Sequence, residues 1–306
     1  MLFKLDFTFT PDVLINYRNP IITLGSCFAE SVAQKLIENR FTVVSNPNGI
    51  LYNPISIANV FNQSSNHEDS DLIYYNDLWH SWNHHGRFSN PNKEAVLSKI
   101  HEEKSLFDNA LQTEGTSIAI TFGTATTYSY SGEVVANCHK LPASKFKQER
   151  LHVNDIVKRF DAILEKFKSN KFIFTVSPVR YTKYGLIENN RNKATLLIAV
   201  DELVSNHTNA SYFPSYEIVN DELRDYRFFE RDLIHPNQLA IDYVWERFVE
   251  TFLDDETKAM LDEWKRVSSL LGHKILNENT AASERFSLKR QHALEDFEKN
   301  FFRESL

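Results

Sequence analysis

The stretch from Ile21 to Ile37 constrains the fold more than any other part of the chain. The β-branched run Ile21–Leu24 ends in Gly25-Ser26, after which apolar residues recur at helical spacing. This pattern predicts a strand–turn–helix joint with Ser26 at the amino end of the helix. The N–H groups and dipole of a helix start favour negative charge by about 0.3–1 kcal/mol in exposed settings. In this position Ser26 can act as a nucleophile, bind an anion, or simply serve as the N-cap of the helix.

Further along the chain, four segments have the short, apolar, β-rich pattern of buried strands. They are Phe41–Val44, Thr116–Phe122, Lys171–Val176 and Tyr212–Val219, with a helix expected at Lys193–Asn206. Strands that alternate with helices predict a parallel sheet covered on both faces. We therefore expect a three-layer α/β/α fold with a five-stranded, mainly parallel sheet. Ligands of such sheets bind at the carboxyl ends of the strands.

Two regions depart from this alternation. Residues 61–115 combine a polar stretch, an aromatic and histidine-rich cluster and a helix, and we expect a lid-like insertion over the active-site face. Residues 1–253 then form the α/β domain, and residues 254–306 form a helical C-terminal extension. An amphipathic stripe that begins at Met260 predicts that this extension packs back onto the domain, or forms a homodimer contact through its helices.

Composition excludes several classes of protein. The formal net charge of −7, with no basic stripe to offset it, argues against a nucleic-acid partner. Cys27 and Cys138 have neither metal-type spacing nor the pattern of a disulfide framework. The start Met1–Asp6 lacks the basic and apolar regions of a signal peptide, and no run approaches the ~20 apolar residues of a membrane span. We expect a cytoplasmic protein without a membrane partner.

A second chemical element is Asp232-Leu233-Ile234-His235, which follows the last expected strand. Three-residue spacing lets both side chains share one face of a turn, so the carboxylate can fix the tautomer of the imidazole. By itself this pair is typical of a capping Asp beside a solvated His. Together with Ser26, in the order Ser, Asp, His, it indicates acyl-transfer chemistry.

The histidine cluster Trp79–His85 offers an alternative site. His80 and His84 are four residues apart, so a helix would align them as metal ligands. The Glu of a hydrolytic zinc motif is missing, and we expect neither a metal nor a cofactor. Two interpretations remain for His80, His84 and His85: a substrate-binding lid, or a structural cluster whose rings have internal partners.

Arg180 and Asn189 are candidates for substrate binding, since Arg180 comes just after a strand. They would recognise a polar or anionic part of a substrate, such as a carboxylate or phosphate. The alternative is a salt network at the start of the next helix, with Glu188, Arg191 and Lys193.

The chain also resembles a known family. Gly25–Ala29 (GSCFA) is similar to the signature that names the GSCFA domain family, which resembles the SGNH (GDSL-type) hydrolases. Further stretches that are similar to this family are Asn46–Pro54 (NPNGILYNP), Trp79–His85 (WHSWNHH), Phe122–Tyr128 (FGTATTY), Ala136–Lys140 (ANCHK), Ser177–Tyr181 (SPVRY) and Tyr226–Asn237 (YRFFERDLIHPN). The resemblance covers roughly residues 20 to 250 and implies an SGNH-hydrolase, flavodoxin-like fold.

The resemblance implies Ser26 as nucleophile, His235 as general base and Asp232 as its orienting partner. It also implies an oxyanion hole that includes the backbone N–H groups of Ser26 and Gly49. After Gly123-Thr124, SGNH hydrolases supply a side-chain Asn, where this chain has Ala125. Losing one such donor costs about 10²–10³ in rate. Either another group, such as Asn53, Thr124 or Thr126, replaces it, or the activity differs from ordinary ester hydrolysis. Gly123 is a further candidate for the oxyanion hole.

Ser26, Asp232 and His235 together therefore predict a serine esterase, and the resemblance to SGNH hydrolases implies a small or carbohydrate O-acyl ester as its substrate. The alternatives are a carbohydrate- or metabolite-binding protein that lacks hydrolysis, and an acyltransferase. Cys27 could also act as nucleophile, because a helix start activates a thiolate, but packing is the commoner role of such a residue.

Overall fold

The computed structural model describes residues 9, 14–62, 71–275 and 280–301. The chain divides into two compact units, Met1–Phe252 and Leu253–Leu306, each of which is described by itself. The expected absence of a signal peptide at Met1–Asp6, and residues 63–70 of the expected insertion, lie outside the described residues.

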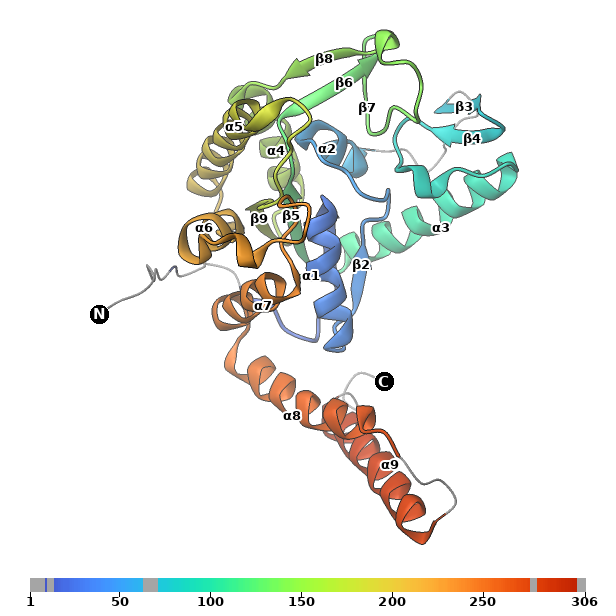
Figure 1. Cartoon of the computed structure of the whole chain (residues 1–306), viewed down its shortest axis with the longest axis vertical. Coiled ribbons are helices and arrows are strands. Elements are labelled where there is room, and N and C mark those ends of the chain that lie inside the picture. Colours follow the sequence, from blue (N-terminus) through green and yellow to red (C-terminus); the bar gives the residue numbers. More distant parts are fainter. Residues whose placement is uncertain (1–8, 10–13, 63–70, 276–279, 302–306) are drawn as a thin grey trace. The chain divides into compact units, whose positions relative to one another are not determined.

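The first unit is built on a five-stranded sheet with the order β10-β9-β5-β1-β2, in which every neighbouring pair is parallel (Figure 1). Its strands are β1 (Ile21–Gly25), β2 (Val43–Ser45), β5 (Ser117–Phe122), β9 (Lys171–Val176) and β10 (Ala210–Tyr212). Helices lie on both faces, so the expected α/β fold with a five-stranded parallel sheet is confirmed.

The helices form two layers because successive side chains of each strand point to opposite faces. On one face Ile22, Ile120 and Phe174 join a core with α2 to α5, and on the other Thr23 and Ile173 lie against α1 and α7 (Figure 1). The helices of this unit are α1 (Cys27–Glu38), α2 (Pro54–Asn62), α3 (Lys93–Gln112), α4 (Val153–Lys166), α5 (Gly185–Asn206), α6 (Ser215–Glu217) and α7 (Gln238–Phe252).

Two small antiparallel sheets accompany the main one. β3 (Leu72–Tyr75) and β4 (Leu78–Ser81) form a hairpin. β6 (Thr126–Tyr130) lies between β7 (Glu133–Val135) and β8 (Lys147–Arg150). The short helical turns are η2 (Gly86–Phe88), η3 (Ala143–Lys145), η4 (Ile218–Leu223) and η5 (Tyr226–Phe228). Within the expected insertion, α3 contributes Phe107 and Leu111 to the main core and so belongs to a helical layer.

The prediction of a strand at Tyr212–Val219 is wrong. β10 ends at Tyr212, and after Pro214 the chain turns into α6 and the π-helical turn η4. Ile218 and Val219 are both fully buried there. A short apolar run of this kind has no periodicity that separates a strand from a buried helical turn.

The second unit consists of α8 (Asp255–Gly272) and α9 (Ala281–Phe301). Trp264 and Val267 of α8 pack against Phe297 of α9, which buries part of the predicted apolar stripe. Asp254 caps α8 by accepting the N–H of Thr257 at 2.7 Å. None of the helices in the described part of the chain is long and apolar enough to cross a membrane.

Candidate active site

The strand order places Ser26 at the topological switch point of the sheet, where successive strands are added on opposite sides of β1. The chain goes from β1 to β2 on one side and then returns to β5 on the other side of β1. In open parallel sheets, ligands bind outside the carboxyl ends of the strands at such a switch point. Ser26 follows β1 directly, and Gly123 follows β5.

The Ser26 hydroxyl is buried and has no internal partner. Only 1% of the residue is exposed, and Oγ makes no hydrogen bond with any described group. Ser26 is the N-cap of α1, but its side chain makes no capping bond. The role of Ser26 as a side-chain cap, which the sequence left open, is therefore not what this structure shows.

Glycines on both sides of the switch point bring the backbones close to Ser26. Gly25 has φ +134°, and a Cβ there would lie 2.1 Å from the Thr121 carbonyl oxygen. A Cβ at Gly123 would lie 3.1 Å from the Tyr52 carbonyl oxygen and 3.4 Å from Cβ of Ser26. Only glycine fits such approaches without displacing backbone.

Asp232 and His235 form the pair that the sequence predicts. Asp232 Oδ2 lies 2.7 Å from His235 Nδ1, while Oδ1 accepts the N–H groups of Ile234 and His235 at 2.9 and 3.0 Å. These hydrogen bonds, that of the His235 ring first, lower the pKa of Asp232 to about 2, so its carboxylate is ionised near neutrality. His235 Nε2 makes no hydrogen bond within the described structure, so it is available to a ligand or a hydroxyl.

The loop that holds this pair is attached to the carboxyl edge of the sheet. Arg180, four residues after β9, donates its N–H to the Ile234 carbonyl at 3.3 Å and its Nη1 to the Leu233 carbonyl at 2.8 Å. Within the loop, Glu230 N–H donates to the His235 carbonyl at 2.7 Å. Asp232 and His235 therefore lie on the same edge of the sheet as Ser26.

The structure does not bring His235 into hydrogen-bond contact with Ser26. His235 has a side chain that is 48% exposed, whereas Ser26 Oγ is buried without a partner. The structure thus joins two of the three predicted catalytic residues and leaves the third separate.

The expected oxyanion donors have internal acceptors. Gly49 N–H donates to the Asn46 carbonyl at 2.6 Å, and the N–H groups of Gly123 and Thr124 both donate to the Tyr52 carbonyl, at 2.8 and 3.0 Å. Asn53 Oδ1 accepts the N–H of Ser56 at the start of α2, and its Nδ2 donates to Ser56 Oγ. Thr124 Oγ1 donates to Asn192. The N–H of Ser26 has only a long bond, 3.3 Å, to the Thr121 carbonyl. Ala125 is fully buried in the core.

Asn46 is a site residue that the sequence reasoning missed. It has φ +45°, its Oδ1 accepts the Gly25 N–H at 2.8 Å, and its side chain is buried with Nδ2 lacking any acceptor among the described groups. A buried amide donor without a partner is costly. The sequence signal for it is the Asn-Pro-Asn-Gly stretch at 46–49, in which Asn46 follows β2.

Lys193 is a second residue whose position the sequence did not indicate. It is 1% exposed, and its Nζ donates to the carbonyls of Gly123 and Ser177, both at 2.7 Å. These carbonyls follow β5 and β9, so Lys193 joins the carboxyl ends of two neighbouring strands. Burial lowers its pKa to about 7. Lys193 is thus separate from the ion pairs of Glu188 with Arg150 and Arg191.

The ring nitrogens of the histidine cluster are directed to internal partners. His80 lies in a strand, β4, with Nδ1 2.6 Å from Ser89 Oγ and Nε2 3.0 Å from the Tyr75 carbonyl. Nδ1 of His84 lies 2.8 Å from Ser81 Oγ, and His85 caps η2. Within the described ranges, no group of three or more His, Cys, Asp or Glu side chains could hold a metal ion. These contacts favour the structural interpretation of the cluster.

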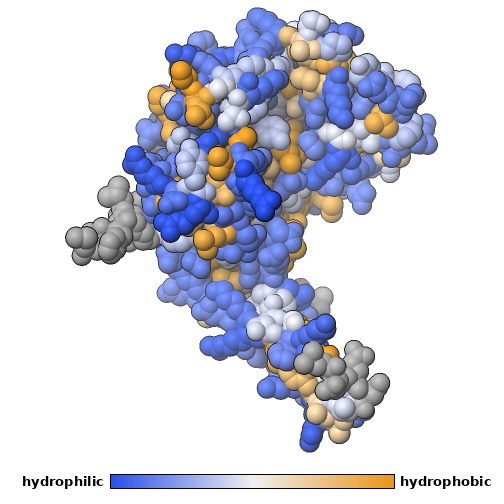
Figure 2. Space-filling model, viewed as in Figure 1, coloured by the Kyte–Doolittle hydropathy of each residue, from blue (hydrophilic) through white to orange (hydrophobic). Residues whose placement is uncertain are grey.

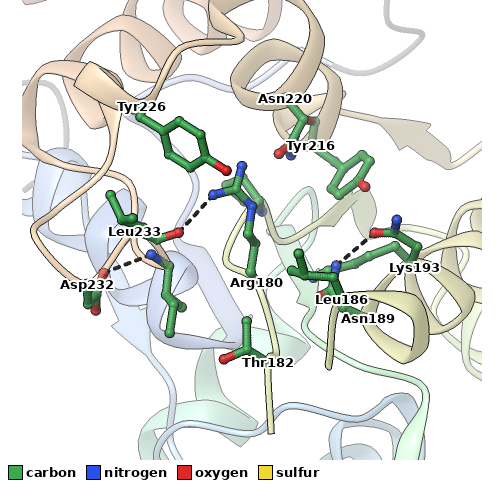
Figure 3. Close-up of a pocket in the computed structure, with 13 residues that line it drawn as sticks. Arg180, Thr182, Leu186, Asn189, Lys193, Tyr216, Asn220, Tyr226, Asp232 and Leu233 are labelled. Carbon is green, nitrogen blue, oxygen red and sulfur yellow. Dashed lines mark hydrogen bonds between the residues drawn. The ribbon is translucent and has the colours of Figure 1, made fainter. Parts of the chain in front are cut away.

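Arg180 and Asn189 line a pocket of about 520 Å³ beside the Asp232 loop (Figure 3). Asn189 is buried and accepts the N–H of Tyr181 at 2.8 Å. Cys27 is half-buried on α1, and burial raises its pKa, which opposes a reactive thiolate.

A comparison with protein families identifies the chain. Residues 20–248 match the model of the GSCFA family, which is most of the chain and includes Ser26, Asp232 and His235. This protein belongs to the GSCFA family. The family resemblance expected from the sequence is therefore confirmed, and the GSCFA match spans the whole candidate site.

A comparison with curated proteins gives no match for this GSCFA chain. Among solved structures, one similar chain is a protein from Streptococcus pneumonia, proposed to be a platelet activating factor. It has a TM-score of 0.41 and 12% identity over 76% of this chain and 83% of that chain. Another is a carbohydrate esterase family 2 enzyme with a carbohydrate binding domain, from Corynascus thermopiles (Myceliophthora fergusii). It has a TM-score of 0.40 and 12% identity over 80% of this chain and 67% of that chain. Scores this low carry no functional argument.

Proposed function

We propose that this GSCFA protein is a serine ester hydrolase of SGNH type, with Ser26 as nucleophile, His235 as general base and Asp232 as its orienting partner. The observation that carries the proposal is the Asp232–His235 pair, joined at 2.7 Å on the edge of the sheet where Ser26 lies. An ionised carboxylate holds the proton on Nδ1, which leaves Nε2 as the base.

The chemistry then proceeds in two stages. His235 Nε2 removes the proton of Ser26 Oγ as Oγ bonds to the ester carbonyl carbon, and the carbonyl oxygen becomes an oxyanion. When the oxyanion collapses, the bond to the leaving alkoxide breaks, and His235 returns the proton to it. Water, activated by the same imidazole, hydrolyses the acyl–Ser26 ester and regenerates the hydroxyl.

The first stage requires His235 and Ser26 to approach each other. Catalytic hydrogen bonds in enzymes without substrate are often long and tighten only in the complex. The exposed loop that carries Asp232 and His235 is the segment that would move. The N–H of Ser26 makes only a long hydrogen bond, and Nδ2 of Asn46, whose Oδ1 accepts the N–H of the adjacent Gly25, has no acceptor among the described groups. We assign the oxyanion to these two donors.

The substrate that we propose is a small or carbohydrate O-acyl ester. This choice rests on fold-level analogy with the SGNH hydrolases. Hydrolysis of 4-nitrophenyl acetate by the purified protein tests the reaction. We expect Ser26→Ala to abolish turnover and His235→Ala to lower kcat by about 10²–10⁴-fold. His101→Ala, a change at an exposed histidine on α3, is the matched control. Full turnover by Ser26→Ala would refute the proposal.

A second candidate is a ligand-binding protein without hydrolysis. It is favoured by the internal acceptors of the expected oxyanion donors and by Ala125 in the position of the side-chain donor. An acyltransferase would use the same three residues, and adding an alcohol or sugar acceptor to the reaction and analysing the products separates transfer from hydrolysis.

A further inference from the structure

The pocket beside the Asp232 loop contains a cation without an anionic partner. Arg180 projects into it between Tyr226 and the side of the pocket that carries Leu186 (Figure 3). In the described structure, no carboxylate lies within ion-pair distance of Arg180, and its guanidinium makes one side-chain hydrogen bond, to the Leu233 carbonyl at 2.8 Å. Four of its five N–H groups are therefore available.

The guanidinium is held in place before any ligand binds. Its central carbon lies 4.1 Å from the centre of the Phe229 ring and 5.3 Å from that of Tyr226. Stacking on aromatic faces restricts a guanidinium to one plane and keeps its edge for a bidentate partner. A planar carboxylate fits such an edge through two parallel N–H···O bonds.

The rest of the pocket complements an anion with an apolar body. The hydroxyls of Thr182, Tyr216 and Tyr226 make no hydrogen bond with described residues and are potential donors. Burial raises the pKa of Tyr216, so its phenol keeps its proton. At the rim, Leu186 and Leu233 are 57% and 50% exposed, which provides apolar surface beside the cation.

The charged groups of the pocket suit a ligand that carries a single negative charge. Asp232 also lines the pocket, but its carboxylate is occupied by His235 and two backbone N–H groups. Lys193 also lines the pocket, but its Nζ is bonded to two carbonyls. Among the described residues that line this pocket, Arg180 thus remains as the one cation available to a ligand. A doubly charged phosphate would meet Asp232 without a second cation.

We propose that this pocket binds a free carboxylate on the substrate, so that the enzyme acts on esters that also carry a carboxylic acid on a short apolar spacer. The inference rests on the proposed function for the orientation of the bound substrate: its ester end lies toward His235, and its carboxylate end binds Arg180. Asp232, which lines the pocket and bonds to His235, connects the two positions.

Calorimetric titration of the Ser26→Ala protein tests the proposal without turnover. The probes are monomethyl glutarate, which carries one carboxylate and one ester, and dimethyl glutarate, which is neutral. We expect the monoacid to bind at least about tenfold more tightly, and Arg180→Gln to remove that preference. Arg231→Gln is the matched control, because Arg231 is exposed in the same loop and does not line the pocket.

Equal affinity for the two probes would overturn the proposal, and so would an equal loss with Arg231→Gln, since that result indicates a general charge effect. Tighter binding of methyl phosphate than of the monoacid would also contradict it. The probe comparison needs no substitution at Arg180, so it remains informative if Arg180→Gln disturbs the loop. If Ser26→Ala prefers the monoacid but the wild type hydrolyses no ester, only the proposed function is refuted. If the wild type hydrolyses esters but Ser26→Ala shows no preference for the monoacid, only this inference is refuted.

Discussion

At the scale of single residues, the candidate site depends on groups whose burial changes their chemistry. The hydroxyl of Ser26 and the amide nitrogen of Asn46 are buried and lack partners among the described residues. Lys193 is a buried amine held by two strand-end carbonyls. Buried polar groups without compensation are costly, and they concentrate at functional sites.

Burial of Lys193 makes the stability of the folded protein depend on pH. Burial lowers its pKa from 10.5 to about 7, so between these values the unfolded chain binds a proton that the folded protein does not. Stability therefore rises with pH across this window, by at most about 1.4 kcal/mol per pH unit. We expect the free energy of unfolding of the wild type to increase relative to that of Lys193→Met from pH 7 to pH 10. Urea unfolding of both proteins measures this difference, and parallel pH curves would contradict the burial of a titrating amine.

Asp232→Asn tests the orienting role of the carboxylate. The amide oxygen can still accept the two backbone N–H groups, so we expect the loop and the fold to persist. It cannot stabilise the imidazolium as an ionised carboxylate does, and we expect kcat to fall by about 10²–10⁴-fold with a small change in KM. Initial rates and circular dichroism measure the two quantities, and an unchanged kcat would show that Asp232 has no catalytic part.

At the scale of elements, the joint between β1 and α1 is the part of the site that the backbone determines most strictly. Gly25 adopts φ +134° and lies against the Thr121 carbonyl of β5, which brings Ser26 to the switch point. The rest of the site is attached to this joint through Asn46, after β2, and Gly123, after β5.

Gly25→Ala separates the effect of this contact from that of the dihedral angle. A second glycine with positive φ, Gly132 at +93°, has no atom within 4 Å of an added Cβ. Strain from φ alone costs of order 1–3 kcal/mol, so we expect Gly132→Ala to lose that much and Gly25→Ala distinctly more. Chemical denaturation of the two variants measures the difference. Equal losses would mean that the contact with β5 relaxes without cost.

Much of the fold could be predicted because its strands and helices are strongly patterned. The joint at Gly25-Ser26 and the pair at Asp232 and His235 both follow from local sequence, and the pair forms as expected. The segment around Ile218 could not be assigned, because a short buried apolar run suits a strand and a helical turn equally. Burial of Lys193 depends on where α5 lies relative to Gly123, which is distant in the sequence. The distance between Ser26 and His235 could not be predicted either, because it depends on the conformation of the loop that carries His235.

At the scale of the whole molecule, the residues proposed for catalysis all belong to the unit Met1–Phe252, while α8 and α9 form a unit with an apolar cluster of its own. On the face shown in Figure 2, the surface is mainly hydrophilic, with apolar side chains exposed in small groups. We propose that α8 and α9 serve assembly rather than chemistry, which is the homodimer contact that the amphipathic stripe beginning at Met260 allows.

We expect a chain ending at residue 253 to fold and to keep the reactivity of Ser26. If α8 and α9 form the homodimer contact that the sequence allows, the full chain is a dimer and the shortened chain a monomer. Light scattering after size-exclusion chromatography measures both masses. A full-length monomer would exclude the dimer contact, and loss of Ser26 reactivity in a folded shortened chain would place part of the site's support in the second unit.

The proposed mechanism requires His235 to activate Ser26, although the two side chains are not bonded in this structure. Fluorophosphonate labelling of the purified protein, read by intact mass and peptide mapping, detects this activation. We predict a single adduct on Ser26 that disappears in Ser26→Ala and forms at least about 10²-fold more slowly in His235→Ala, with His101→Ala labelled at the wild-type rate. Absence of an adduct in the folded wild-type protein, or equal labelling of His235→Ala, would contradict the account and favour a ligand-binding protein.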